Sequence, residues 1–241
     1  MKFGFSSDIG EITPSIFSKL SRSSRAKIFI NLYNACVENE LRIPKKYAKF
    51  EEGLEKIFLR RVDDLCKFSH QSFKKSSVFC PFSNVIIHAF RNGNLSDIPV
   101  LNCIPKHSAA KLLLLLKSQN GICFDANIMF SQFVYDKIRR KHFDKNVYFQ
   151  DGIIFAEREG RKIFGVLPSF KEISKDRFHL ANYEIARAFK ALNENGFEKM
   201  FVVFPRNVNF SKHIEVETSC GAYAHEGRLK LVPYTISRDV I

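Results

Sequence analysis

The sequence contains no tryptophan and no long apolar run, although it has 25 phenylalanines among its 241 residues. Leu112–Leu116 is among the longest apolar runs, whereas a helix that crosses a bilayer needs about 20 apolar residues. No apolar stretch of the kind found in a cleaved signal peptide follows Lys2. We therefore expect no transmembrane segment and a cytoplasmic protein. The serine-rich start leaves open export as an effector without a cleaved signal peptide.

Paired cysteines are also missing. None of the six cysteines forms a C-x-x-C pair, and no cysteine and histidine cluster has the spacing of a zinc site. These absences argue against a zinc-binding module and favour free thiols in a reducing compartment.

Positive charge is abundant, with a net charge of +13. Residues 1–120 carry 19 basic and 10 acidic side chains, so most of the excess lies in the first half. A field of this sign favours a polyanionic partner, and we expect nucleic acid, either DNA or RNA. The simpler reading is a solubilising surface. The candidate nucleic-acid-binding side chains are Arg60, Arg61, Lys74, Lys75, Arg139 and Arg140.

Two regions with different periodicities follow each other along the chain. Residues 1–119 form a basic and mainly helical region, in which apolar spacing predicts helices over residues 24–39, 51–67 and 106–117. Residues 120–241 alternate between helix and strand. There we expect helices over 124–143 and 178–193, and strands over 147–155, 162–167, 200–204, 214–217 and 229–235. This order predicts an α/β (α+β) fold with a mixed sheet flanked by helices.

Acidic residues mark two points in the second region. Asp125 opens the expected first helix, and Asp151 precedes a strand. With the order of elements, these residues make the region 121–205 resemble the core of the PD-(D/E)xK nuclease superfamily. The resemblance implies a restriction-endonuclease-like core and Mg²⁺-dependent cleavage of phosphodiesters. Gly165 and Leu167 stand where the superfamily has its Glu-x-Lys.

A second arrangement in that superfamily replaces Glu-x-Lys with Ser-x-Lys and takes the glutamate from the next helix. Ser169, Lys171 and Glu184 resemble it. The resemblance implies catalytic Asp151, Lys171 and Glu184, with Asp151 and Glu184 binding Mg²⁺ through hard oxygen donors. The metal would activate a water, and Lys171 would orient it or neutralise phosphate. The plainer reading is that Asp151 is a turn residue and Lys171 a solvated side chain.

Cys123 offers a different chemistry. It precedes the expected helix 124–143, and a thiol at a helix N-terminus has a stabilised thiolate. The segment is loosely similar to papain-like effector proteases and deamidases, with His213, His179 or His225 as the base. The alternatives to a nuclease are therefore a cysteine-dependent hydrolase and a catalytically inert interaction protein. The oligomeric state is left open.

Overall fold

A computed structural model describes residues 1–6, 8–49, 53–72, 81–93, 95–98, 105–118, 121–216 and 228–237. The chain divides into two compact units, Met1–Asp125 and Ala126–Ile241. We expected the boundary after residue 119, but the structure places it after Asp125. The reason is that strand β3 (Gly121–Asp125) pairs with a strand of the first unit.

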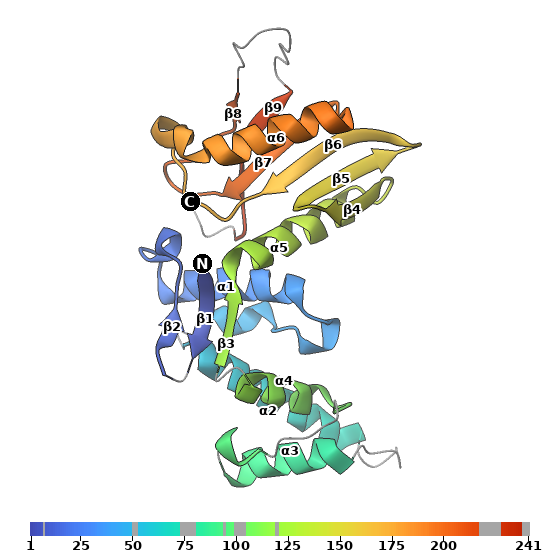
Figure 1. The fold of residues 1–241 in the computed structure, drawn as a ribbon. Coiled ribbons are helices and arrows are strands. Elements are labelled where there is room, and N and C mark those ends of the chain that lie inside the picture. The colour runs from blue at the N-terminus through green and yellow to red at the C-terminus, as the bar shows by residue number, and fades with distance from the viewer. Residues whose placement is uncertain are drawn as a thin grey trace. The chain divides into compact units, whose positions relative to one another are not determined.

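The first unit contains a small antiparallel sheet that the sequence did not lead us to expect. Its strand order is β2–β1–β3, with β1 at Lys2–Ser6 and β2 at Gly10–Ile12 (Figure 1). Two glycines allow β1 and β3 to approach closely. A Cβ on Gly4 would lie 1.9 Å from the Ile122 carbonyl oxygen, and one on Gly121 would lie 2.3 Å from the Phe5 carbonyl oxygen.

Helices make up the rest of the first unit, as expected. Short 3₁₀ turns connect several of them. Phe3, Phe29, Tyr33 and Phe58 are fully buried and form an aromatic core, in which Tyr33 and Phe58 have ring centroids 5.0 Å apart. The elements are α1 (Arg22–Cys36), α2 (Leu54–Ser72), α3 (Pro81–Asn92), α4 (Ser108–Ser118), η1 (Ser15–Phe17), η2 (Asn39–Leu41), η3 (Lys45–Lys49) and η4 (Leu95–Asp97).

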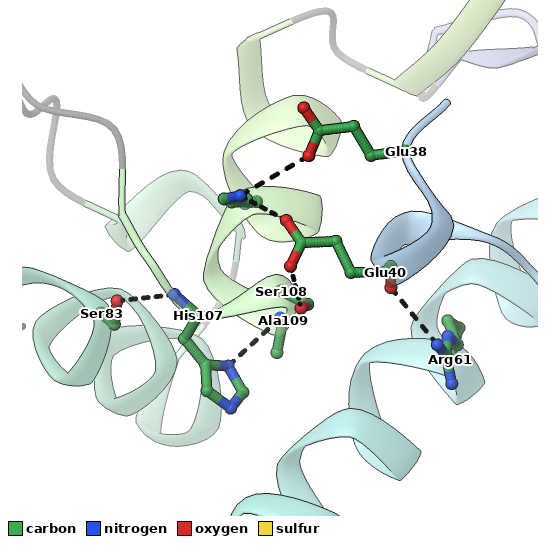
Figure 2. Close-up of polar contacts among 8 residues, drawn as sticks. Glu38, Glu40, Arg61, Ser83, His107, Ser108 and Ala109 are labelled. Carbon is green, nitrogen blue, oxygen red and sulfur yellow. Dashed lines mark hydrogen bonds and ion pairs between the residues drawn. The ribbon is translucent and has the colours of Figure 1, made fainter. Parts of the chain in front are cut away.

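A polar network ties α4 to η2 (Figure 2). Lys111 on α4 forms ion pairs with Glu40 and, at 3.8 Å, with Glu38. The Ser108 hydroxyl donates to Glu40 Oε2 at 3.3 Å. His107 precedes the helix, and its Nδ1 accepts a hydrogen bond from the Ala109 N–H at 3.2 Å. This bond satisfies one of the free donors at the start of α4, so His107 serves as the helix cap.

The second unit is built on a six-stranded mixed sheet with the order β4–β5–β6–β7–β9–β8 (Figure 1). Strands β4, β5 and β6 form an antiparallel meander, and β6, β7 and β9 are parallel. The prediction of a mixed α/β fold is confirmed for this unit. The strands are β4 (Asn146–Gln150), β5 (Ile153–Arg158), β6 (Arg161–Pro168), β7 (Lys199–Pro205), β8 (Ile214–Glu215) and β9 (Leu229–Tyr234).

Two helices pack on opposite faces of this sheet. Helix α6 (Asn182–Asn195) follows η5 (Lys175–Ala181) and buries Ala188 and Leu192 against residues such as Leu231. Helix α5 (Ala126–Lys141) contacts Tyr234 through Phe130, with ring centroids 6.3 Å apart. Because side chains alternate along a strand, Leu231 and Tyr234 point to opposite faces of β9.

Turn chemistry sets several element ends in the second unit. Helix α6 ends at Gly196, which has φ +66° and whose N–H donates to the Leu192 carbonyl at 3.2 Å, as the Asn195–Gly196 pair led us to expect. The strand expected over 147–155 is instead two strands. The structure places Asp151 and Gly152 between them, in a two-residue turn with φ +51° and +75°. None of the helices in the described residues is long and apolar enough to cross a membrane.

Candidate functional site

Strand β6 carries no charged side chain at the two positions where the superfamily has Glu-x-Lys. Leu167 is 1% exposed and belongs to the core under α6. A Cβ on Gly165 would lie 2.5 Å from Met200 Sδ and 3.0 Å from the Phe197 ring. Both positions therefore face an apolar interior, where an unpaired charge would be very costly.

Polar side chains gather just after β6 ends. The Ser169 N–H donates to the Val203 carbonyl at 2.9 Å, which continues the pairing with β7 for one residue. The next residue, Phe170, is buried against Phe130, and its N–H donates to Asn127 Oδ1 at 3.0 Å. This anchor fixes the backbone between Ser169 and Lys171.

Glu184 meets both of these residues from the first turn of α6. Its Oε1 accepts a hydrogen bond from the Ser169 hydroxyl at 3.1 Å, and its Oε2 lies 3.5 Å from Lys171 Nζ. Lys171 Nζ also donates to the Leu180 carbonyl at 2.5 Å. The Glu184 side chain is 13% exposed and that of Lys171 is 42% exposed. The structure thus brings Ser169, Lys171 and Glu184 together at the carboxyl end of β6.

Asp151 lies at the same end of the sheet. Because Ile154 pairs with Val166, the turn before β5 and the segment after β6 are neighbours at that edge. Asp–Gly is the preferred sequence of a tight hairpin turn, so the turn itself explains both residues. The structure records no contact between the Asp151 carboxylate and Glu184 among the described residues.

Arg187 is a residue of this edge that the sequence reasoning missed. It lies one helical turn after Glu184, and its guanidinium donates a hydrogen bond to the Asp151 carbonyl oxygen. A Cβ on Gly152 would lie 2.6 Å from the guanidinium, so the glycine makes room for it. The spacing of three residues from Glu184, which places both on one helix face, was the available signal.

The carboxylate oxygens at this edge are of the type that Mg²⁺ binds. Mg²⁺ prefers oxygen ligands, often binds proteins through one or two carboxylates, and keeps several waters. Glu184 lies at this edge, and Asp151 is in the turn beside it. Within the ranges that the structure describes, no group of three or more histidine, cysteine, aspartate or glutamate side chains is arranged to hold a metal. A metal here would therefore depend on two protein carboxylates at most.

The expectation that Cys123 lies at the start of a helix is wrong. Cys123 lies in the middle of β3 and pairs with Gly4 of β1, while α5 begins only at Ala126. It therefore has no helix N-terminus to stabilise a thiolate. Burial raises the pKa of the Cys123 thiol, whereas a catalytic cysteine needs a lowered pKa. Asp125 ends β3, stands directly before the first residue of α5, and forms an ion pair with the N-terminal amine at 3.2 Å.

The candidate basic residues have different surroundings. Arg139 and Arg140 are exposed but pair with Asp136, at 3.7 and 2.6 Å. Arg61 donates to the Glu40 carbonyl at 3.3 Å, whereas Arg60 lines a surface cleft. Lys74 and Lys75 lie outside the described residues.

Comparison with known proteins shows a likeness of fold. No protein-family model and no curated protein matches the chain. One similar solved structure is a chain of the refined half-complex from the tetradecameric assembly of Thermococcus gammatolerans McrB AAA+ hexamers with bound McrC. The TM-score is 0.66 at 10% identity, over 97% of this chain and 77% of that chain. The present sequence has no Gly–Lys pair, which the phosphate-binding loop of P-loop NTPases requires. The shared feature is the fold.

Proposed function

We propose that the protein binds nucleic acid and that its second unit cleaves phosphodiester bonds with the help of Mg²⁺. The order of elements supports this proposal: α5 is followed by the β4–β5–β6 meander, then α6, then β7 parallel to β6. This is the order that the nuclease superfamily resemblance implies for a restriction-endonuclease-like core.

The observation that carries the proposal is the convergence of Ser169, Lys171 and Glu184 beside the Asp151 turn. Sequence reasoning selected these residues for a chemical role, and Glu184 reaches Ser169 and Lys171 across a separation of 15 and 13 residues. Glu184 and Asp151 would hold Mg²⁺, which stabilises charge on a phosphate and activates a water. Lys171 would neutralise a phosphate oxygen at the same edge.

The test is a cleavage assay on DNA and RNA with Mg²⁺ or Mn²⁺, using the full chain and three variants, Asp151→Asn, Lys171→Met and Glu184→Gln. We expect the rate to fall by about 100-fold or more in each variant, as is typical when one charge-stabilising group is lost at a transition state. Glu194→Gln is the matched control, because Glu194 lies on the same helix and pairs with the exposed Lys190. Cleavage that survives Glu184→Gln would assign the activity to another site.

A catalytically inert binding protein is the second candidate. It is favoured by the burial of Gly165 and Leu167 and by the pairing of Glu184 with Lys171. The similar structure comes from an assembly, which would suit an interaction role for this chain. Binding of nucleic acid without cleavage by any metal tested would select this candidate.

A further inference from the structure

A polar cleft lies on the first unit, between η3 and α2. Its volume is about 490 Å³. Lys46 and Tyr47 line it from η3, and the remaining lining residues belong to α2. Among the residues that the structure describes, four basic side chains and two acidic ones line it, so this lining carries a net positive charge. They are Lys46, Lys56, Arg60 and Lys67, with Asp63 and Asp64.

Helix geometry places the α2 cations in a row. Lys56, Arg60 and Lys67 are separated by four and seven residues, so they share one face of the helix. At 1.5 Å per residue the row is about 16 Å long. Lys46 adds a fourth cation from η3. A linear row of this kind fits a polymer of regularly spaced anions better than a single small anion.

The two aspartates neutralise only part of the positive charge of the four basic side chains. Asp64 accepts a hydrogen bond from the Tyr47 hydroxyl and lies 3.8 Å from Lys67 Nζ. Lys56 is exposed and Arg60 half-buried, and both still line the cleft. Lys56 and Arg60 lie four residues apart on the α2 wall of the cleft, where an incoming anion would meet them.

The described lining of the cleft offers charge but no exposed aromatic ring. Tyr47, the aromatic residue among the described lining residues, is 3% exposed, so its face is covered by protein. Stacking on a base needs an accessible ring face. Contact with the sugar–phosphate backbone, without readout of base sequence, is the mode that these side chains support.

We infer that this cleft is the phosphate-backbone contact surface of the first unit, and that it binds nucleic acid independently of sequence. The inference rests on the proposed nucleic-acid binding and adds the site and mode of contact. A membrane surface is the weaker fit. Peripheral membrane binding usually adds inserted apolar side chains to basic ones, and the cleft-lining Leu59 and Tyr47 are not among the exposed large hydrophobic residues.

The pair Arg60 and Arg61 supplies an internal contrast. Both were candidates from the sequence, but the Arg61 guanidinium binds the Glu40 carbonyl and is absent from the cleft lining. Arg61→Gln should therefore lower the stability of the first unit while leaving the phosphate contacts in place. Arg60→Gln should weaken the phosphate contacts.

The experiment measures the affinity of the full chain for a fluorescein-labelled 20-base-pair duplex in EDTA, by anisotropy, between 50 and 300 mM salt. The test variant is Lys56→Gln/Arg60→Gln. The matched control is Lys19→Gln/Lys106→Gln, which removes the same charge from exposed positions of the same unit. The slope of log K against log salt is negative, and each lost phosphate contact reduces its magnitude by about 0.9. We expect a decrease of about 1.8 in the test variant and little change in the control.

Three results would overturn the inference: equal slopes in the two double variants, a slope of zero for the unaltered protein, or binding to phosphatidylserine vesicles but not to the duplex. Because EDTA removes divalent metal, the result does not depend on cleavage. If the protein cleaves nucleic acid but Lys56→Gln/Arg60→Gln has no effect on binding, the proposed activity stands and the cleft is not the binding site. If the protein binds through the cleft but never cleaves, the cleft stands and the proposed activity is wrong.

Discussion

Leu167 and Ser169 are two residues apart, yet their surroundings give them different roles. The first is sealed in the core, and the second lies past the end of β6 and donates to Glu184. The resemblance to the Ser-x-Lys arrangement pointed to Ser169, Lys171 and Glu184, and the structure brings these three side chains together. The sequence was not sufficient to find Arg187, whose contact with the Asp151 turn depends on how α6 packs.

The error at Cys123 has a similar cause. The sequence predicts a helix over residues 124–143 directly after Cys123, but α5 begins at Ala126 and Gly121–Asp125 is a strand. Pairing with β1, more than 110 residues earlier in the chain, decides its strand conformation. Tertiary pairing of this kind overrides local preference.

His107 links the stability of the first unit to pH. Burial lowers the pKa of its imidazole, and its Nδ1 accepts the capping hydrogen bond from Ala109 only when that nitrogen is unprotonated. Nearby Glu40 opposes the shift. Since the folded pKa is below the unfolded value of about 6.5, the stabilisation is complete above that pH and is lost as pH falls through the folded pKa.

We therefore expect His107→Asn to lose less stability than the unaltered protein between pH 7.5 and 5.5, because asparagine can cap without titrating. Urea unfolding followed by circular dichroism at several pH values measures this. His88→Asn, at an exposed histidine on α3, is the control. An identical pH dependence in His107→Asn and the unaltered protein would show that the cap does not titrate.

At the scale of elements, long amphipathic segments were the most predictable. The helices α1, α2, α4 and α6 lie close to the expected ranges, because three or four turns of apolar spacing give a clear signal. The short strands β1 and β2 were not predicted. Five and three residues are too few for a periodic pattern, and their pairing with β3 depends on contacts distant in sequence.

Gly4 shows how tightly that small sheet is built. With φ +149° and the Ile122 carbonyl oxygen where a Cβ would be, Gly4→Ala should cost at least about 3 kcal/mol of stability, from backbone strain and overpacking together. Gly10→Ala is the matched control, since Gly10 has φ +78° but no atom within 4 Å of its Cβ position. There we expect about 1–2 kcal/mol, from the backbone conformation alone.

Urea midpoints of the two variants give the comparison. Equal losses for Gly4→Ala and Gly10→Ala would mean that β1 can move away from β3 without penalty.

At the scale of the whole molecule, the division into two units is the main feature that charge and periodicity indicated. The described core cluster under α6, which includes Phe204 and Leu231, is drawn from residues after Asp125. We expect the fragment 126–241 to fold by itself, with a cooperative urea transition and a stability on the order of 5 kcal/mol. Circular dichroism of the purified fragment tests this. A gradual loss of signal with urea would show that the unit needs residues 1–125.

The contacts of Glu184 affect how a metal ion could bind to the second unit. Lys171 supplies it with a tethered counter-ion, and Ser169 takes its other oxygen. A divalent ion that arrives there has to displace an ammonium group of the same chain, so occupancy of this carboxylate is an exchange rather than a simple addition. Without a bound ion, the charge of Glu184 is balanced by Lys171. An ion or a phosphate would bind here only if its interactions with Glu184 and Lys171 were stronger than the ion pair between these two residues.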